Sequence, residues 1–355
     1  MKVELEKLCS DYLANRETVS KVFRWDNTAI HSACANIFCA CGRTADESSL
    51  KECRKVIKKH TRPFSKFRGK LRPVLSSMLA ISDNPEARMD LANEYFNLLK
   101  RKFKKTEYLV LAAFLLTDLT EKSLTEETAA RGKEIYRRMN KQHRLLTNNT
   151  DSVFAMLMAF SEKTDDELVS DVETCYSFLK KQFSSSSAVQ TSAQVLSSAS
   201  GSPEENAQRM IDLYNALHEV DVKYGHSSEL APLAALSLAD TPVTGLVEEI
   251  TSVDAFLGSQ KGYGTGGISR EDRAMHAVMI VSDQYAGTRQ VNVTVMTNTL
   301  DMLISKQQAS RVSFFFHLLQ FAAQILSGSR EKAADEGKAD KDTGTDNGAD
   351  TDKQP

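Results

Sequence analysis

The chain has 355 residues, of which 41% are hydrophobic and 26% are charged, and its formal net charge is −2 at pH 7. This content can bury a large core and excludes a fully disordered chain, while a pI of about 6.4 lacks the overall basic character of a dedicated nucleic-acid binder. The charge is nevertheless divided, because residues 1–150 carry 29 Lys/Arg against 18 Asp/Glu and residues 151–355 carry 16 against 29. Such a division can steer partners or favour head-to-tail association of copies.

The first predicted element is an N-terminal helix over residues 1–25. Its first 15 residues are charged and amphipathic, and they lack the continuous apolar core and small-residue cleavage site of a secretory signal. We therefore expect a cytoplasmic protein.

Paired helices follow. Residues 70–81 place Leu71, Val74, Leu75, Met78 and Leu79 at the spacing of a half-buried helix. Asn84-Pro85-Glu86 then predicts the start of a second helix. Asn caps this helix, Pro occupies its first position, and the negative charge of Glu is favourable at the positive end of the helix dipole.

Similar start signals recur later in the chain. They are Ser123 to Glu126, Thr164 to Glu167, Ser202-Pro203 and Thr241-Pro242, with capping-box spacing in the first two. The helices that precede three of these signals are short and highly apolar, at residues 108–116, 153–160 and 230–238. We expect such helices to form the inner layer of a stacked array.

An aromatic residue marks the second helix of each pair. Tyr95, Tyr136, Tyr176, Tyr214 and Phe256 follow one another at intervals of 41, 40, 38 and 42 residues, which is the period of a helical-hairpin repeat. The sequence thus predicts an all-α fold, an array of helical hairpins of the α-solenoid or α/α-toroid type, in one domain over residues 1–326. Its expected repeats are about 28–69, 70–107, 108–150, 151–187, 188–228 and 229–269, followed by C-terminal helices over 270–326.

The C-terminal region is read from composition. Apolar and polar residues alternate from Val291 to Met296 as in a strand, but the segment lies between predicted helices, and we assign it to a helix. Val312 to Leu326 is apolar but shorter than the ~20 residues of a membrane span, which favours a buried or capping helix over a membrane-surface one. Residues 327–355 are rich in Gly, Asp and Lys without an aromatic residue and are expected to be a disordered tail.

Basic residues concentrate between Lys51 and Arg72. Two interpretations are open. In the first, the stretch binds phosphates through its cations, and Phe64, Phe67 and Phe103 are available for stacking on bases. In the second, it is an ordinary solvated face whose phenylalanines point inward. We favour the solvated face. The candidate contacts are Lys51, Arg54, Lys55, Lys58, Lys59 and Arg62.

A Gly-rich stretch at residues 261–267 is the candidate ligand site. Glycine lets backbone amides approach a phosphate, but the dinucleotide and P-loop patterns both fail here because a helix precedes and Ile268-Ser269 follows. An inter-repeat loop is the simpler interpretation. Side chains that could converge there on an anion are Tyr263, Gly264, Arg270, Arg273 and His226.

Neither metal nor cofactor is predicted. Cys34, Cys39, Cys41 and Cys53 lack Cys-x2-Cys spacing, so we interpret them as small buried residues in a reducing compartment. The seven histidines are scattered, and no catalytic template fits. Whether the protein is an enzyme stays open at this stage.

Several short segments are similar to a known family. They are Leu8 to Glu17, Phe23-Arg24-Trp25, Phe67-Arg68-Gly69, Asp151 to Ala155 and Lys261 to Gly264, and together they resemble the bacterial family catalogued as domain of unknown function 4003. The resemblance implies a helical, cytoplasmic bacterial protein and supplies no catalytic residues. Cys39, Cys41 and the residues after Ser327 fall outside the family pattern.

Three functions follow as hypotheses. The first is a non-catalytic scaffold that binds a protein or peptide, as helical-repeat arrays commonly do. The second is an enzyme or small-anion-binding protein with its site near Gly262 to Gly267. The third is nucleic-acid binding through residues 51–72.

Overall fold

The computed structural model describes residues 1–26, 28–118, 124–142, 151–161, 163–197, 199, 201–227, 229–263 and 267–285. These residues are helical with no named strand, which confirms the all-α prediction for this part of the chain. The α-helices are α1 (Val3–Val22), α2 (Thr28–Ala40), α3 (Glu47–Lys59), α4 (Arg72–Ala80), α5 (Pro85–Leu99), α6 (Glu107–Leu116), α7 (Glu126–Gln142), α8 (Asp151–Met158), α9 (Asp165–Leu179), α10 (Ser186–Leu196), α11 (Pro203–Glu219), α12 (Leu230–Ser237), α13 (Val243–Gly258) and α14 (Arg270–Tyr285). A short 3-10 helix, η1 (Lys66–Arg68), precedes α4.

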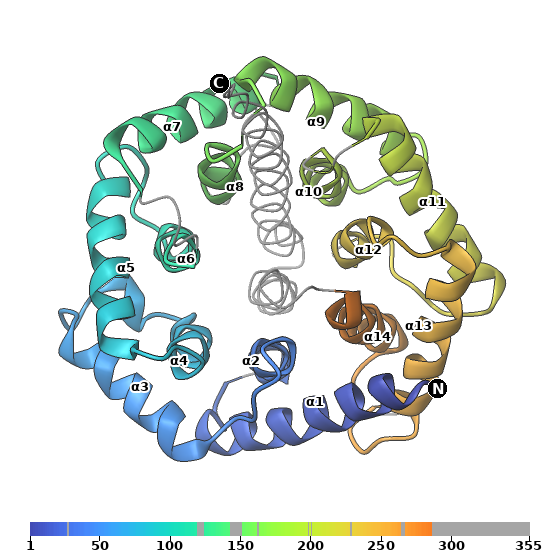
Figure 1. Ribbon diagram of the computed structural model, residues 1–355, viewed down its shortest axis with the longest axis horizontal. Helices are drawn as coiled ribbons and strands as arrows, with labels where there is room; N and C mark the ends of the chain where they lie inside the picture. Colours follow the sequence, from blue (N-terminus) through green and yellow to red (C-terminus); the bar gives the residue numbers. More distant parts are fainter. Residues whose placement is uncertain are drawn as a thin grey trace, which may run out of the picture.

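The helices are arranged in two layers around a ring (Figure 1). Odd-numbered helices form the outer layer, and even-numbered helices, seen end-on in Figure 1, form the inner layer. Each outer helix packs against the inner helix that follows it in the chain, from α1 with α2 to α13 with α14. The hairpin that packs together is therefore an outer helix followed by an inner one.

The two ends of the described chain close the ring. Helix α1 packs against α13 and α14, and α2 packs against α14 (Figure 1). Lys2, just before α1, also forms an ion pair with Glu249 of α13, and Glu249 accepts a hydrogen bond of 2.7 Å from the Tyr285 hydroxyl. Contacts between residues far apart in sequence thus hold the first hairpin against the last.

All inner helices end at the same rim of the ring. Arg88 of α5 donates to the Met78 carbonyl near the end of α4 at 2.7 Å and to Thr117 and Asp118 just after α6, at 3.1 and 2.6 Å. On the other side of the ring, Asn206 donates to the last residue of α10 and Arg209 to the last residue of α12. We call this rim the end rim, and the opposite rim, where loops lead from outer into inner helices, the start rim.

Arginine side chains near the start of outer helices fasten one hairpin to the next. Arg131 of α7 donates to the carbonyls of Ala159, Ser161 and Lys163 at 3.1, 2.7 and 2.5 Å and to Asp165 at 2.9 Å. The carbonyls at the end of a helix lack intrahelical partners, so a guanidinium with its five donors satisfies several of them at once.

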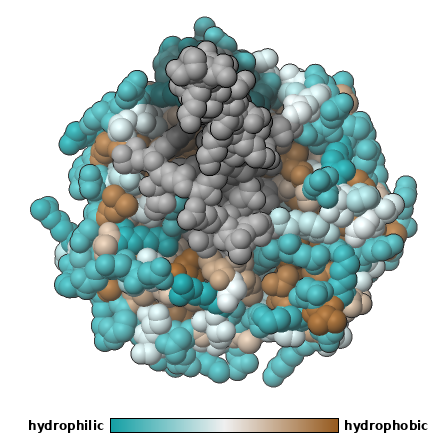
Figure 2. All heavy atoms as spheres, in the orientation of Figure 1, coloured by the Kyte–Doolittle hydropathy of each residue, from teal (hydrophilic) through white to brown (hydrophobic). Residues whose placement is uncertain are grey.

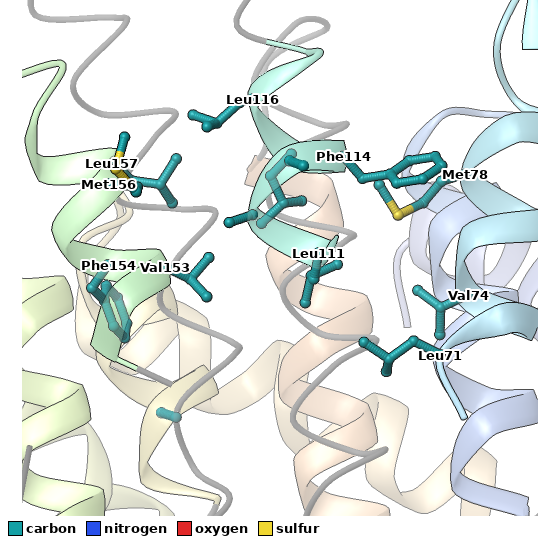
Figure 3. Packing of buried hydrophobic residues seen from close by; sticks show 14 of the residues in the cluster. Leu71, Val74, Met78, Leu111, Phe114, Leu116, Val153, Phe154, Met156 and Leu157 are labelled. Atoms are coloured by element: carbon teal, nitrogen blue, oxygen red, sulfur yellow. The ribbon is translucent and has the colours of Figure 1, made fainter. Parts of the chain in front are cut away.

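The inner helices supply much of the core because most of their side chains are buried. All residues of α6 from Leu109 to Leu116 are buried, as are all residues of α8. Figure 3 shows side chains of α4, α6 and α8, such as Met78, Phe114 and Leu157, directed toward one another. Each fully buried large aliphatic or aromatic side chain contributes roughly 1.5–3 kcal/mol, which explains why these short helices need almost uniformly apolar sequences.

Most predicted helix starts are found as expected, with two corrections. Asn84, Thr164 and Ser202 cap α5, α9 and α11 with their side chains. Thr241 makes no such cap, since α13 begins at Val243 with Pro242 at the cap position. At α7 the observed cap is Thr125, whose hydroxyl accepts from the Thr128 amide at 3.1 Å, because the helix begins at Glu126, two residues later than the Ser123 pattern predicts.

Several expectations fall outside the described residues. They are Ser123, the strand-like residues 291–296, the apolar segment 312–326, the C-terminal helices beyond Tyr285 and the tail over 327–355. Within the described ranges, no helix combines the length and apolarity that a bilayer crossing needs. Figure 2 shows hydrophilic side chains dominating the perimeter of the face it presents, with smaller hydrophobic areas between them.

Candidate functional site

A buried polar cluster lies where the ring closes. The Tyr263 hydroxyl is 3.0 Å from Nδ1 of His276 on α14, and the Tyr12 hydroxyl of α1 lies 3.5 Å from the same nitrogen. Arg16 of α1 places its guanidinium carbon 5.4 Å from the centre of the Tyr263 ring. We call these four residues the closure cluster.

Both phenols of the closure cluster stay protonated at neutral pH. Burial raises the pKa of Tyr263 well above its usual value, and the neighbouring Tyr12 raises it further. Burial also raises the pKa of Tyr12, although Arg16 acts in the opposite direction. Each hydroxyl therefore keeps a proton that it can donate within the cluster.

Tyr263 repeats a packing position found in earlier hairpins. Phe103 and Phe183, each in the loop after an outer helix, meet Tyr136 and Tyr214 of the next outer helix edge-on, with ring centres 6.0 and 4.9 Å apart. Tyr263 follows outer helix α13, and its hydroxyl meets that of Tyr12 on α1, the next outer helix around the ring. Since Tyr12 stands two repeat lengths ahead of Tyr95, the closure joins aromatic residues at the equivalent positions, through their hydroxyls instead of their ring edges.

Several polar side chains near the closure have buried atoms without a hydrogen-bond partner, among them Asp283 and Asn36. Both carboxyl oxygens of Asp283 on α14 and both amide atoms of Asn36 on α2 are in this state. Burial raises the pKa of Asp283 well above its usual range, and its charge would also raise the pKa of the Cys39 thiol on α2. An unpaired carboxyl in a dry interface favours its neutral form.

The residues predicted to bind an anion lie in different settings. Tyr263 is turned into the closure cluster, with 7% of its surface exposed, and Arg273 forms a bidentate pair with Asp254 at 2.8 and 2.7 Å. Arg270 is exposed, 3.8 Å from Asp221, and His226 is also exposed. Gly264 lies outside the described residues.

The glycines at either end of this loop serve its backbone geometry. Gly262 has a φ of 91°, which other residues rarely adopt. Gly267 lies against the Gly262 carbonyl, where a side chain would collide with it, and the amide of Ile268 donates to that carbonyl at 3.0 Å. Both positions therefore have a structural account that needs no ligand.

The cysteines are distributed along different interfaces. All six thiols are free, and Cys39 packs with the closure side of α2 whereas Cys34 packs in the larger core. In the part of the chain that the structure describes, no three His, Cys, Asp or Glu side chains come together as a metal site.

The basic stretch is partly neutralised by its neighbours. Lys51 pairs with Glu47 at 3.0 Å, Lys55 with Glu52 at 2.6 Å and Lys59 with Glu86 at 2.8 Å. Phe67 and Phe103 are buried, so the stacking role considered for them is wrong, because both pack on the next outer helix. Phe64, in contrast, is 100% exposed.

Phe64 belongs to a surface on the start rim. Trp25, in the loop after α1, is 87% exposed, and the Arg24 guanidinium lies 4.8 Å from the centre of its ring. Arg54 of α3 lies over the Phe23 ring at 5.5 Å, which brings the Trp25 loop to α3, and α3 leads directly into the Phe64 loop. We call this the Trp25–Phe64 surface.

Exposed cations without an ion-pair partner among the described residues lie on the same loops as these two aromatic residues and at the end of α3. Five exposed side chains on the same loops and on the end of α3 make no ion pair within the described ranges: Arg24, Lys58, Arg62, Lys66 and Lys70. The sequence shows Trp25 and Phe64 plainly, but their exposure could not be read from it, because the neighbouring aromatics Phe23 and Phe67 are buried.

Comparison with known proteins identifies a family. The model of the family described as protein of unknown function DUF4003 matches residues 15–309, which is most of the chain. The protein belongs to this family. No curated protein and no solved structure matches the chain.

Membership of DUF4003 confirms the resemblance found in the sequence. The match includes the Trp25–Phe64 surface and, apart from Tyr12, the closure cluster. The family description states no activity, so the roles of both sites depend on their geometry and chemistry.

Proposed function

We propose that this DUF4003 protein is a non-catalytic scaffold of the α/α-toroid type that binds a protein partner on its start rim. The array consists of outer and inner helices whose first and last hairpins meet. Such arrays offer extended surfaces for partners, and their rigidity lets loops present side chains in fixed positions.

One observation carries the proposal. Trp25 and Phe64 are the only aromatic side chains among the described residues that are both large and exposed, at 87% and 100%. Exposing a large aromatic side chain to water is unfavourable, and tryptophan together with arginine is enriched among the residues that dominate protein interfaces. Two such residues beside unpaired cations support a protein-binding role.

The closure cluster supports a structural rather than a catalytic role for the residues at which α1 meets α14. Its phenols and imidazole bind one another at a junction between hairpins, the place at which Phe103–Tyr136 and Phe183–Tyr214 join other hairpins by ring contacts. A cytoplasmic location is part of this proposal, and six free, mostly buried thiols are in keeping with a reducing compartment.

Affinity purification tests the scaffold function. Tagged wild-type protein and the double variant Trp25→Ala/Phe64→Ser are used to capture partners from a nuclease-treated lysate of the cells in which the protein occurs. We expect at least one protein to be retained by the wild type and lost from the double variant.

The matched control is Val220→Ser, which removes another exposed apolar side chain, 48% exposed at the end of outer helix α11. This control variant should retain the partner. A set of captured proteins that is the same for the wild type and the double variant would contradict the proposal.

A further inference from the structure

We infer that the Trp25–Phe64 surface recognises an extended acidic peptide segment that carries at least one large apolar side chain. This inference rests on the proposed function and names the chemistry of the partner. The surface combines two needs that a single ligand must meet, namely neutralisation of free cations and coverage of exposed aromatic rings.

The charge of the ligand follows from the pairing of the basic residues. Acidic neighbours already form ion pairs with Lys51, Lys55 and Lys59 on α3. Arg68 donates hydrogen bonds to the carbonyls of Lys58 and Thr61. The cations left over cluster toward the two loops: Arg24, Lys58, Arg62, Lys66 and Lys70. Because the free charge is positive and concentrated beside Trp25 and Phe64, the complementary ligand is negative there.

The apolar requirement follows from the aromatic rings. Arg24 stacks on Trp25, yet 87% of this tryptophan remains accessible, and nothing covers Phe64. A cation already stacked on an indole can contact a carboxylate while the ring receives an apolar side chain. Carboxylates alone would leave both rings in water, so the ligand needs an apolar group between its acidic ones.

A peptide fits this surface better than a nucleic acid does. Carboxylates are interleaved with the cations along α3 and its neighbour α5, at Glu47, Glu52, Glu86 and Asp90, and they would repel a continuous phosphate backbone. The aromatic residues that would extend a stacking track, Phe67 and Phe103, are buried. A peptide can place its carboxylates only where the free cations lie.

The chain provides its own reporter for a test, since Trp25 is its single tryptophan. The purified full-length protein is titrated with a synthetic peptide of 14 residues in which Glu alternates with Leu around a central Phe. We expect the Trp25 emission to shift to shorter wavelength and to become less accessible to acrylamide. Raising the salt from about 50 to 300 mM should weaken binding at least about fivefold, because exposed charges are screened.

Variants locate the peptide on the surface. Arg62→Glu/Lys66→Glu should weaken binding at least about tenfold, and Phe64→Ser by a similar factor, as expected when an interface side chain of major importance is lost. The matched control, Lys104→Glu/Lys105→Glu, reverses two exposed cations on the next loop of the same rim and should change binding less than about twofold. Thermal melts by circular dichroism verify that each variant is folded.

The outcomes separate the two proposals. Failure of the acidic peptide to bind, equal binding of the same peptide with Lys in place of Glu, or a Trp25 response to oligo(dT) alone would overturn the inference. If a cellular protein still requires Trp25 and Phe64 but is not displaced by the acidic peptide, the scaffold function stands and only the acidic specificity is wrong. If no protein requires these residues, the scaffold function itself fails.

Discussion

The hydroxyl of Tyr263 meets Nδ1 of His276 at 3.0 Å inside the junction that closes the ring. Tyr263 lies in the loop after α13, and His276 lies on α14, the last inner helix among the described residues. Tyr12, from the first outer helix, approaches the same nitrogen. A single imidazole thus connects the two ends of the array.

Removing the Tyr263 hydroxyl should weaken this junction by a modest amount. Tyr263→Phe keeps the ring and loses one buried hydrogen bond, so the free energy of unfolding should fall by about 1 kcal/mol. Tyr263→Ala also removes the ring and should cost about 3–5 kcal/mol, as for other large aromatic truncations. Urea unfolding measures both values, and similar losses for the two variants would show that the ring contributes little.

Asp283→Asn should stabilise the protein increasingly as the pH rises. The pKa of Asp283 is raised in the folded state, so folding favours its neutral form. The free energy of unfolding therefore includes a full contribution from this carboxyl below about pH 4, and that contribution is lost as the pH rises toward the folded pKa. Asparagine imitates the neutral carboxyl without this loss. At pH 7 the variant should exceed the wild type by at least about 1 kcal/mol, the equivalent of roughly one pKa unit.

The pH dependence supplies the control for Asp283. Urea unfolding of both proteins between pH 4 and pH 8 should give stability curves that diverge as the pH rises. Parallel curves would mean that the carboxyl is ionised and solvated in the folded protein.

Arg131→Met should destabilise the array by about 2–4 kcal/mol, because it leaves buried carbonyls without donors. In the wild type this guanidinium binds three carbonyls and Asp165. Arg137→Met is the control, since Arg137 pairs only with Glu134 on the exposed side of the same helix and should change stability by less than about 0.5 kcal/mol. Equal effects in chemical denaturation would refute a role for Arg131 in joining hairpins.

The thiols should react slowly in the native protein at pH 8. Burial raises the pKa of Cys9, Cys34, Cys41 and Cys175 to about 12 and that of Cys53 to about 11, and the thiolate is the reactive form. Reaction with a disulfide reagent should therefore be at least about a hundredfold slower than in urea. A rapidly reacting thiol in the native protein would identify an interface that opens.

The sequence determined the elements and their order. Apolar spacing, caps such as Asn84 and Thr164, and the interval between tyrosines are local features, because helix formation depends on residues within a few turns. They predicted the helices of the hairpins, and the apolarity of residues 109–116 identified an inner-layer segment that is buried throughout. The family resemblance was likewise contained in short segments and is confirmed by the match.

Only the tertiary structure decided what those residues contact. Tyr12 and His276 are 264 positions apart, and no spacing pattern connects them, because their meeting depends on small rotations accumulated over every hairpin. For the same reason Phe67 turns inward whereas Phe64, three residues earlier, is fully exposed. Exposure and pairing are properties of neighbours brought together by the closed ring, so the Trp25–Phe64 surface and the unpaired Asp283 emerged only when the helices were placed.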